Sequence, residues 1–76
     1  MKEFVEFIIR HLVDKPEDVK VTELIGKRLT VYEVSVASGD FGKVLGKKGR
    51  TAMAIRLLLI AASKKIGRNA YLELIE

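Results

Sequence analysis

The chain has 76 residues, of which 49% are hydrophobic and 32% charged, and its net charge is +4. This composition is typical of a folded chain and excludes a disordered tail, and 76 residues form one domain with no room for a second. Cysteine is absent, which excludes disulfides and thiolate metal sites and makes a reducing compartment, the cytoplasm, the expected location.

The first predicted element is an amphipathic helix over residues 2–14, which ends before Pro16. Its apolar side chains recur at steps of three and four residues, at Phe4, Val5, Ile8, Ile9, Leu12 and Val13. Acids lie within its first apolar stretch, so it does not fit a secretory signal. His11 is the only histidine, and because no second histidine or cysteine can join it in a metal site, we expect it on the flank of this helix.

Two strands are predicted next, joined as a hairpin at Gly26. The first alternates apolar and polar residues over 19–22, and the second is rich in β-branched residues over 29–36. In the second strand Tyr32, Val34 and Val36 share one face, which we expect to meet the core. The other face carries both apolar and polar side chains, and it can face either water or a partner.

Two helices and a final strand complete the prediction. Residues 38–40 (Ser-Gly-Asp) provide a helix start, with a side-chain oxygen for the free amides of the next turn. A short helix over residues 41–45 is then followed by a long helix that begins at Arg50 and ends before Gly67. The long helix is apolar nearly all round between residues 57 and 62, so we expect it to be buried on more than one side.

The order helix, strand, strand, helix, helix, strand predicts an α+β fold with three helices on one face of a three-stranded sheet. The last strand, over residues 70–75, follows two helices, so it can pair parallel to an earlier strand. No apolar run after residue 50 approaches the ~20 residues of a membrane helix, and we expect no membrane segment.

Positive charge is concentrated in one part of the sequence. Residues 41–68 carry eight Lys or Arg and no acid, whereas the rest carries six bases and ten acids. A division of +8 against −4 indicates a polyanion partner more than a uniformly basic surface would. The alternative is a solvated basic face without a partner.

Within this basic region, Gly42, Gly46 and Gly49 form a glycine-rich stretch that does not fit the common nucleotide loops. A P-loop needs a glycine five residues before its Gly-Lys pair and Ser or Thr after it, but position 41 is Phe and position 48 is Lys. A dinucleotide fingerprint spaces its glycines two and then three apart, whereas these are four and then three apart. A helix-turn-helix is disfavoured because its second helix would expose residues 57–62 in a DNA groove.

A backbone clamp remains. In it, a Gly-X-X-Gly turn between two helices lies against a single strand, and Lys47 and Lys48 meet its phosphates. The amides that begin the long helix add partial positive charge. Residues 44–50, Val-Leu-Gly-Lys-Lys-Gly-Arg, resemble the signature of KH domains, which hold about four nucleotides with such a loop.

The preceding helix and hairpin resemble the type II KH arrangement of bacteria, and the whole length is similar to the small stand-alone KhpA type. This resemblance implies a non-catalytic protein that binds single-stranded RNA, as a general RNA chaperone or post-transcriptional regulator. It also implies a homodimer, or a heterodimer with a larger KH protein of the KhpB (Jag) type. The alternative is a protein-interaction subunit in which RNA binding is secondary.

The resemblance also assigns roles to individual residues. It implies that Gly46, Lys47, Lys48 and Gly49 form the backbone clamp. Their expected neighbours in the groove are Gly42, Lys43, Val44, Leu45, Arg50 and Arg56. Phe41 is interpreted as a core anchor in preference to a stacking platform. No catalytic residue set, metal site or cofactor is expected, because no carboxylate pair or Ser/His/Asp set is visible.

Overall fold

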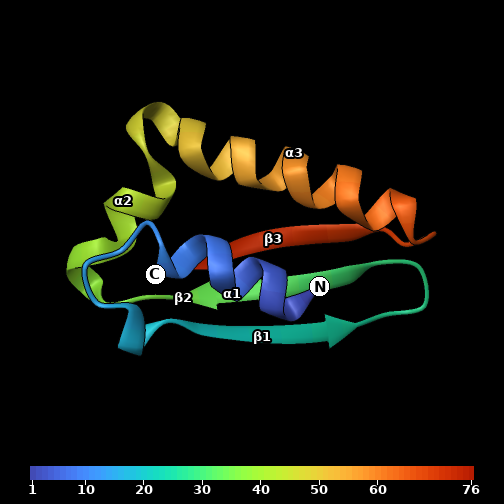
Figure 1. The fold of residues 1–76 in the computed structure, drawn as a ribbon, viewed down its shortest axis with the longest axis horizontal. Helices are drawn as coiled ribbons and strands as arrows, with labels where there is room; N and C mark the ends of the chain where they lie inside the picture. The colour runs from blue at the N-terminus through green and yellow to red at the C-terminus, as the bar shows by residue number, and fades with distance from the viewer.

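The computed structural model describes residues 1–76 and centres on a three-stranded sheet (Figure 1). The strands are β1 (Lys20–Ile25), β2 (Thr30–Ser35) and β3 (Ala70–Ile75). The middle strand, β2, pairs antiparallel with β1 and parallel with β3. The hairpin and the parallel third strand are therefore confirmed, and the two helices between β2 and β3 provide the long crossover that parallel pairing requires.

Three α-helices accompany the sheet, and three 3₁₀ turns lie between the regular elements. The helices are α1 (Lys2–Arg10), α2 (Phe41–Leu45) and α3 (Arg50–Lys65), and the turns are Pro16–Asp18, Ser38–Asp40 and Lys47–Gly49. In Figure 1, α1 lies in front of the sheet and α3 runs along β3. The predicted α+β order of elements is confirmed. No helix has both the length and the apolar character needed to cross a bilayer.

The core lies between the helices and one face of the sheet. Tyr32 and Val34 on β2 are only 2% and 1% exposed, whereas Val31 and Glu33, which alternate with them along the strand, are half-buried. This alternation confirms the predicted core face of β2 and leaves the opposite face of the sheet open. The buried apolar cluster draws on every strand and α-helix: Val5, Ile9, Val19, Val21, Tyr32, Val34, Val44, Ile55, Leu59, Ala70 and Leu72.

The first helix is shorter than predicted. It ends at Arg10, where the prediction extended it to residue 14. The N–H groups of His11 and Leu12 donate to carbonyls three residues back, at 3.2 and 3.0 Å, so the last turn tightens. Leu12 and Val13 then contact the core from outside the helix, which explains why the apolar periodicity continues beyond the helix end.

The long helix α3 is also less buried than predicted. Ala52, Ile55 and Leu59 face the core, but Leu57 and Leu58 are 61% and 55% exposed. A single chain provides only one sheet face for α3 to cover, so the expectation that it is buried on more than one side is wrong for the isolated chain. The consequence is an exposed apolar surface on α3.

Tyr32 provides a pH-dependent test of the core. Burial, and then the hydrogen bond that its hydroxyl donates to Glu23 at 2.7 Å, raise the pKa of Tyr32 from 10.0 to about 12. Because the folded state holds the phenol proton more tightly than the unfolded chain, this stabilisation is complete below pH 10 and is lost as the pH rises through about 12. Denaturant titrations should show a loss of up to about 3 kcal/mol over this interval. The variant Tyr32→Phe should lose less stability there, and an equal loss would contradict the assignment.

Candidate nucleic-acid interface

Residues Gly46, Lys47, Lys48 and Gly49 form the Gly-Lys-Lys-Gly loop, which joins α2 to α3. The chain turns sharply there because Gly46, Lys48 and Gly49 all have positive φ, at 77°, 55° and 74°. The Gly46 N–H donates to the Gly42 carbonyl at 2.8 Å, and the Gly49 N–H donates to the Gly46 carbonyl at 3.1 Å. The first bond ties the loop to α2, and the second closes the loop on itself.

The two glycines of the loop are required for different reasons. A Cβ on Gly46 would collide with the Thr51 side chain and would lie 2.8 Å from the Thr51 backbone nitrogen. Its φ of 77° and ψ of 173° also fall in a region that only glycine occupies readily. A Cβ on Gly49 would meet no atom within 4 Å, so only its left-handed φ favours glycine.

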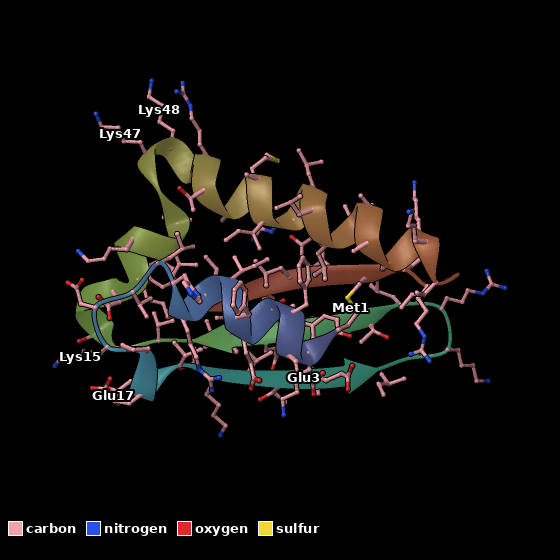
Figure 2. The ribbon with its side chains drawn as sticks, viewed as in Figure 1. Met1, Glu3, Lys15, Glu17, Lys47 and Lys48 are labelled. Atoms are coloured by element: carbon pink, nitrogen blue, oxygen red, sulfur yellow. The ribbon has the colours of Figure 1, made fainter.

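The two lysines of the loop are exposed and extend away from the rest of the molecule (Figure 2). Neither forms a salt bridge within the chain. Arg50, the first residue of α3, is also exposed, and no side chain caps the start of this helix. The loop therefore presents three free cations beside a helix N-terminus, a combination that favours an anion.

The four predicted neighbours on α2 have different environments. Gly42 is exposed, and a Cβ there would meet no atom within 4 Å. The Lys43 ammonium lies 3.5 Å from the Asp14 carboxylate in an exposed ion pair. Leu45 is 37% exposed, but Val44 is 0% exposed. Val44 therefore anchors α2 in the core and offers no surface to a ligand, so we leave it out of the proposed contacts.

Arg56 connects α3 to the free edge of β3. Its Nε donates to the Leu72 carbonyl at 3.1 Å, and its guanidinium carbon lies 5.3 Å from the centre of the Tyr71 ring. A charged donor thus occupies the junction between α3 and the unpaired side of the edge strand.

Asp40 has a different role from the one predicted. No side chain caps α2, so the expected helix-start bond from residues 38–40 is not formed. Instead, Asp40 is only 3% exposed, and its Oδ2 accepts the Lys15 backbone N–H at 3.0 Å. The carboxylate thus fastens the segment after α1 to the start of α2, a contact between residues 25 positions apart that no local pattern indicates.

Phe41 and His11 lie outside the loop. Phe41, at the start of α2, is half-buried, and the buried core cluster does not include it. His11 is exposed on the flank of α1, as predicted, with Nδ1 2.7 Å from the Phe7 carbonyl oxygen and its ring against the Phe7 ring. Neither residue belongs to the Gly-Lys-Lys-Gly loop or to its hydrogen bonds.

The structure also brings together cations that the linear sequence separates. Lys27 and Arg28, which lie outside the basic stretch of residues 41–68, line the same hollow as Arg68. The Asn69 Nδ2 donates to the Arg28 carbonyl at 3.2 Å across the two loops. In the sequence, the only local indication of this second basic cluster was the run Gly26-Lys27-Arg28 at the predicted hairpin turn.

Comparison with known proteins identifies close relatives. Residues 2–74 match the family described as "KhpA/KhpB, KH domain". The RNA-binding protein KhpA of Chlamydia trachomatis is 46% identical over 76 residues, covering 100% of this chain and 97% of that protein. Proteins of the same name from Clostridium perfringens and Aquifex aeolicus are 48% and 42% identical, covering 99% and 100% of this chain and 100% and 96% of their own lengths. No solved structure matches this chain.

Proposed function

The chain belongs to the KhpA/KhpB family of KH domains, and on this basis we propose that it binds single-stranded RNA through its Gly-Lys-Lys-Gly loop. The observation that carries the proposal is that Lys47 and Lys48, on a turn between two helices, are exposed and form no salt bridge. The members of this family are non-catalytic RNA-binding proteins.

The proposed binding mode is a backbone clamp. Phosphates of one strand contact the loop lysines, Arg50 and the first amides of α3, because all of these are positive or hydrogen-bond donors. The missing side chains of Gly46 and Gly49 let the RNA backbone approach closely. Bases would then lie toward Leu45 and Arg56, over the junction of α3 and β3.

We further infer a general rather than a sequence-specific role, as an RNA chaperone or post-transcriptional regulator in the cytoplasm, with all 76 residues working as one domain. Charged groups and backbone amides dominate the proposed interface, and neither reads base identity. The loop itself contains no aromatic side chain, and among the proposed base positions only Tyr71, which is 42% exposed beside Arg56, offers a ring for stacking.

Salt dependence tests the proposed RNA binding. If the loop neutralises two to four phosphates, affinity for an eight-nucleotide oligouridylate should fall about 7- to 50-fold between 50 and 200 mM salt, from a slope of about −0.7 per phosphate. Fluorescence anisotropy at several salt concentrations measures this slope. Binding that is undetectable at 50 mM salt would contradict the proposal.

A second proposal, association into dimers, rests on the exposed face of α3. Met53, Leu57 and Leu58 are 56%, 61% and 55% exposed on one helix. Apolar side chains gathered in this way mark protein contacts more often than bare surface. The partner is a second copy of this chain or a larger KH protein of the KhpB (Jag) type, and pairing two loops would raise affinity for one RNA through effective concentration.

Light scattering with one pair of variants tests the dimer. The wild-type chain, of 8.5 kDa, should scatter with twice that mass, and Leu57→Asp should return it to the monomer. The matched control is Phe7→Asp on α1, because Phe7 is 62% exposed and Leu57 61%. If Phe7→Asp dissociated the dimer as fully as Leu57→Asp, the dimer contact would not be assigned to the exposed face of α3. A dimer that binds no RNA at low salt would favour the alternative of a protein-interaction subunit.

A further inference from the structure

The largest hollow in the molecule lies away from the Gly-Lys-Lys-Gly loop. We name it the hairpin hollow: the β1–β2 turn with one strand residue on each side (residues 25–30) and residues 67–69 before β3 line it, and its volume is about 440 Å³. Three of its nine lining residues, Lys27, Arg28 and Arg68, are cations, none is an acid, and two are hydrophobic. Small-molecule pockets are lined mainly by apolar side chains, so this lining suits a solvated anion better than an enclosed metabolite.

The two loops that line the hollow are fixed relative to each other. The Thr30 N–H donates to the Asn69 carbonyl at 2.9 Å, and the Asn69 side chain donates to the Arg28 carbonyl at 3.2 Å. The Arg68 N–H donates to the Ser63 carbonyl at 2.8 Å, which ties the second loop to the end of α3. A ligand would therefore meet cations whose backbone positions are already ordered.

The positive charge of the hollow is not neutralised within the chain. The chain contains ten acids, yet none forms a salt bridge with Lys27, Arg28 or Arg68, all of which are exposed. The backbone N–H groups of Lys27 and Arg28 also have no acceptor in the protein. Like charges gathered at one place repel one another, and a bound polyanion would relieve this repulsion.

The hollow and the Gly-Lys-Lys-Gly loop lie at opposite ends of α3. The loop precedes Arg50, the first residue of α3, and the hollow begins at Gly67, two residues after α3 ends at Lys65. Figure 1 shows the β1–β2 turn and the end of α3 together at one end of the molecule, with the start of α3 at the other. At a rise of about 1.5 Å per residue, a helix of 16 residues spans about 24 Å.

We propose that the hairpin hollow is a second phosphate-binding site, which takes the RNA backbone outside the segment held by the Gly-Lys-Lys-Gly loop. This inference rests on the proposed RNA binding and extends it from one binding point to two, at the two ends of α3. An RNA of only about four nucleotides fills the loop alone, whereas a longer strand reaches both sites.

Oligouridylates of four and sixteen nucleotides, titrated into the full chain, test the second site. The variant combines Lys27→Gln, Arg28→Gln and Arg68→Gln, and the matched control combines Arg10→Gln, Lys15→Gln and Lys20→Gln, which remove the same charge elsewhere. The hollow variant should bind the tetranucleotide within twofold of wild type. Its affinity for the longer RNA at 50 mM salt should fall about eightfold for every phosphate that the hollow no longer neutralises, and its salt slope should be shallower by about 0.7 for each such phosphate.

The outcomes separate this inference from the proposed function. Equal affinity and equal slope for the longer RNA in the hollow variant and the control would overturn the second site and leave the proposed function standing. Failure of wild type to bind either RNA would overturn both. Tighter binding of polyglutamate than of RNA at the hollow, or inorganic phosphate as its only ligand, would also overturn the assignment to RNA. If the triple variant does not fold, Arg68→Gln alone is measured by the same titrations.

Discussion

Replacing Lys47 and Lys48 together by aspartate is expected to lower affinity for single-stranded RNA by about 10²- to 10³-fold. Two attractions of about 1 kcal/mol each at 4 Å in water are removed, and two repulsions of similar size replace them. Screening by salt reduces this total of about 4 kcal/mol, and each 1.4 kcal/mol corresponds to a tenfold change. Filter retention and anisotropy at 50 mM salt measure the difference.

The fold should survive this change. Both lysines are exposed and without salt bridges, and surface substitutions of this kind alter stability by about 0.5 kcal/mol or less. Lys48 has a φ of 55°, and aspartate adopts this left-handed region more readily than most residues. Circular dichroism and the melting temperature should therefore match the wild-type values.

The matched control is the pair Lys15→Asp and Lys20→Asp. Both pairs change the net charge from +4 to 0, and Figure 2 shows Lys15 toward the same end of the molecule as Lys47 and Lys48 but at its opposite edge. If the effect came from net charge alone, the two pairs would weaken binding equally. That result, or undiminished binding by the loop variant, would remove the loop from the proposed interface.

The second large effect is expected from Gly46→Ala, which should lower stability by about 3 kcal/mol. A Cβ at this position would lie 2.6 Å from the Thr51 Cβ and 2.8 Å from the Thr51 backbone nitrogen. Thr51 belongs to α3, so the collision can be relieved only by moving the helix start. At about 4 to 8 °C per kcal/mol, the melting temperature should fall by about 12 to 24 °C.

Two other glycines provide a graded control. Gly49→Ala has open space but a φ of 74°, so it should cost about 1 to 2 kcal/mol. Gly42→Ala meets no neighbour and lies within α2, so it should raise the melting temperature by about 2 to 8 °C, because alanine favours a helix by about 0.5 to 1 kcal/mol. Any other order of the three melting temperatures would show that the described loop geometry is wrong.

These two experiments separate the two properties of the loop. The lysine pair should change RNA affinity at constant stability, because its side chains contact only solvent. Gly46→Ala should change stability first, because its backbone conformation determines where α3 begins. If the lysine pair and Gly46→Ala both changed stability but neither changed RNA affinity, that outcome would contradict the proposed function. It would not contradict the described fold.

Much of the fold follows from local patterns in the sequence. Strand alternation at Tyr32 and Val34, the glycine stops and the apolar periodicity are properties of neighbouring residues, so they predict the elements and their order. The spacing of Gly42, Gly46 and Gly49 similarly excluded the common nucleotide loops. The type of each element and the position of the basic loop were thus determined by the sequence alone.

Other features depend on residues far apart in the chain, and only the tertiary structure decided them. The sequence could not indicate that Asp40 accepts the Lys15 N–H, or that Lys27 and Arg28 join Arg68 around one hollow. The sequence also led to a wrong expectation of burial for Leu57, which is exposed. An apolar side chain is buried only if another surface covers it. Periodicity records which side of a helix is apolar, whereas exposure depends on how many surfaces the fold places against that helix.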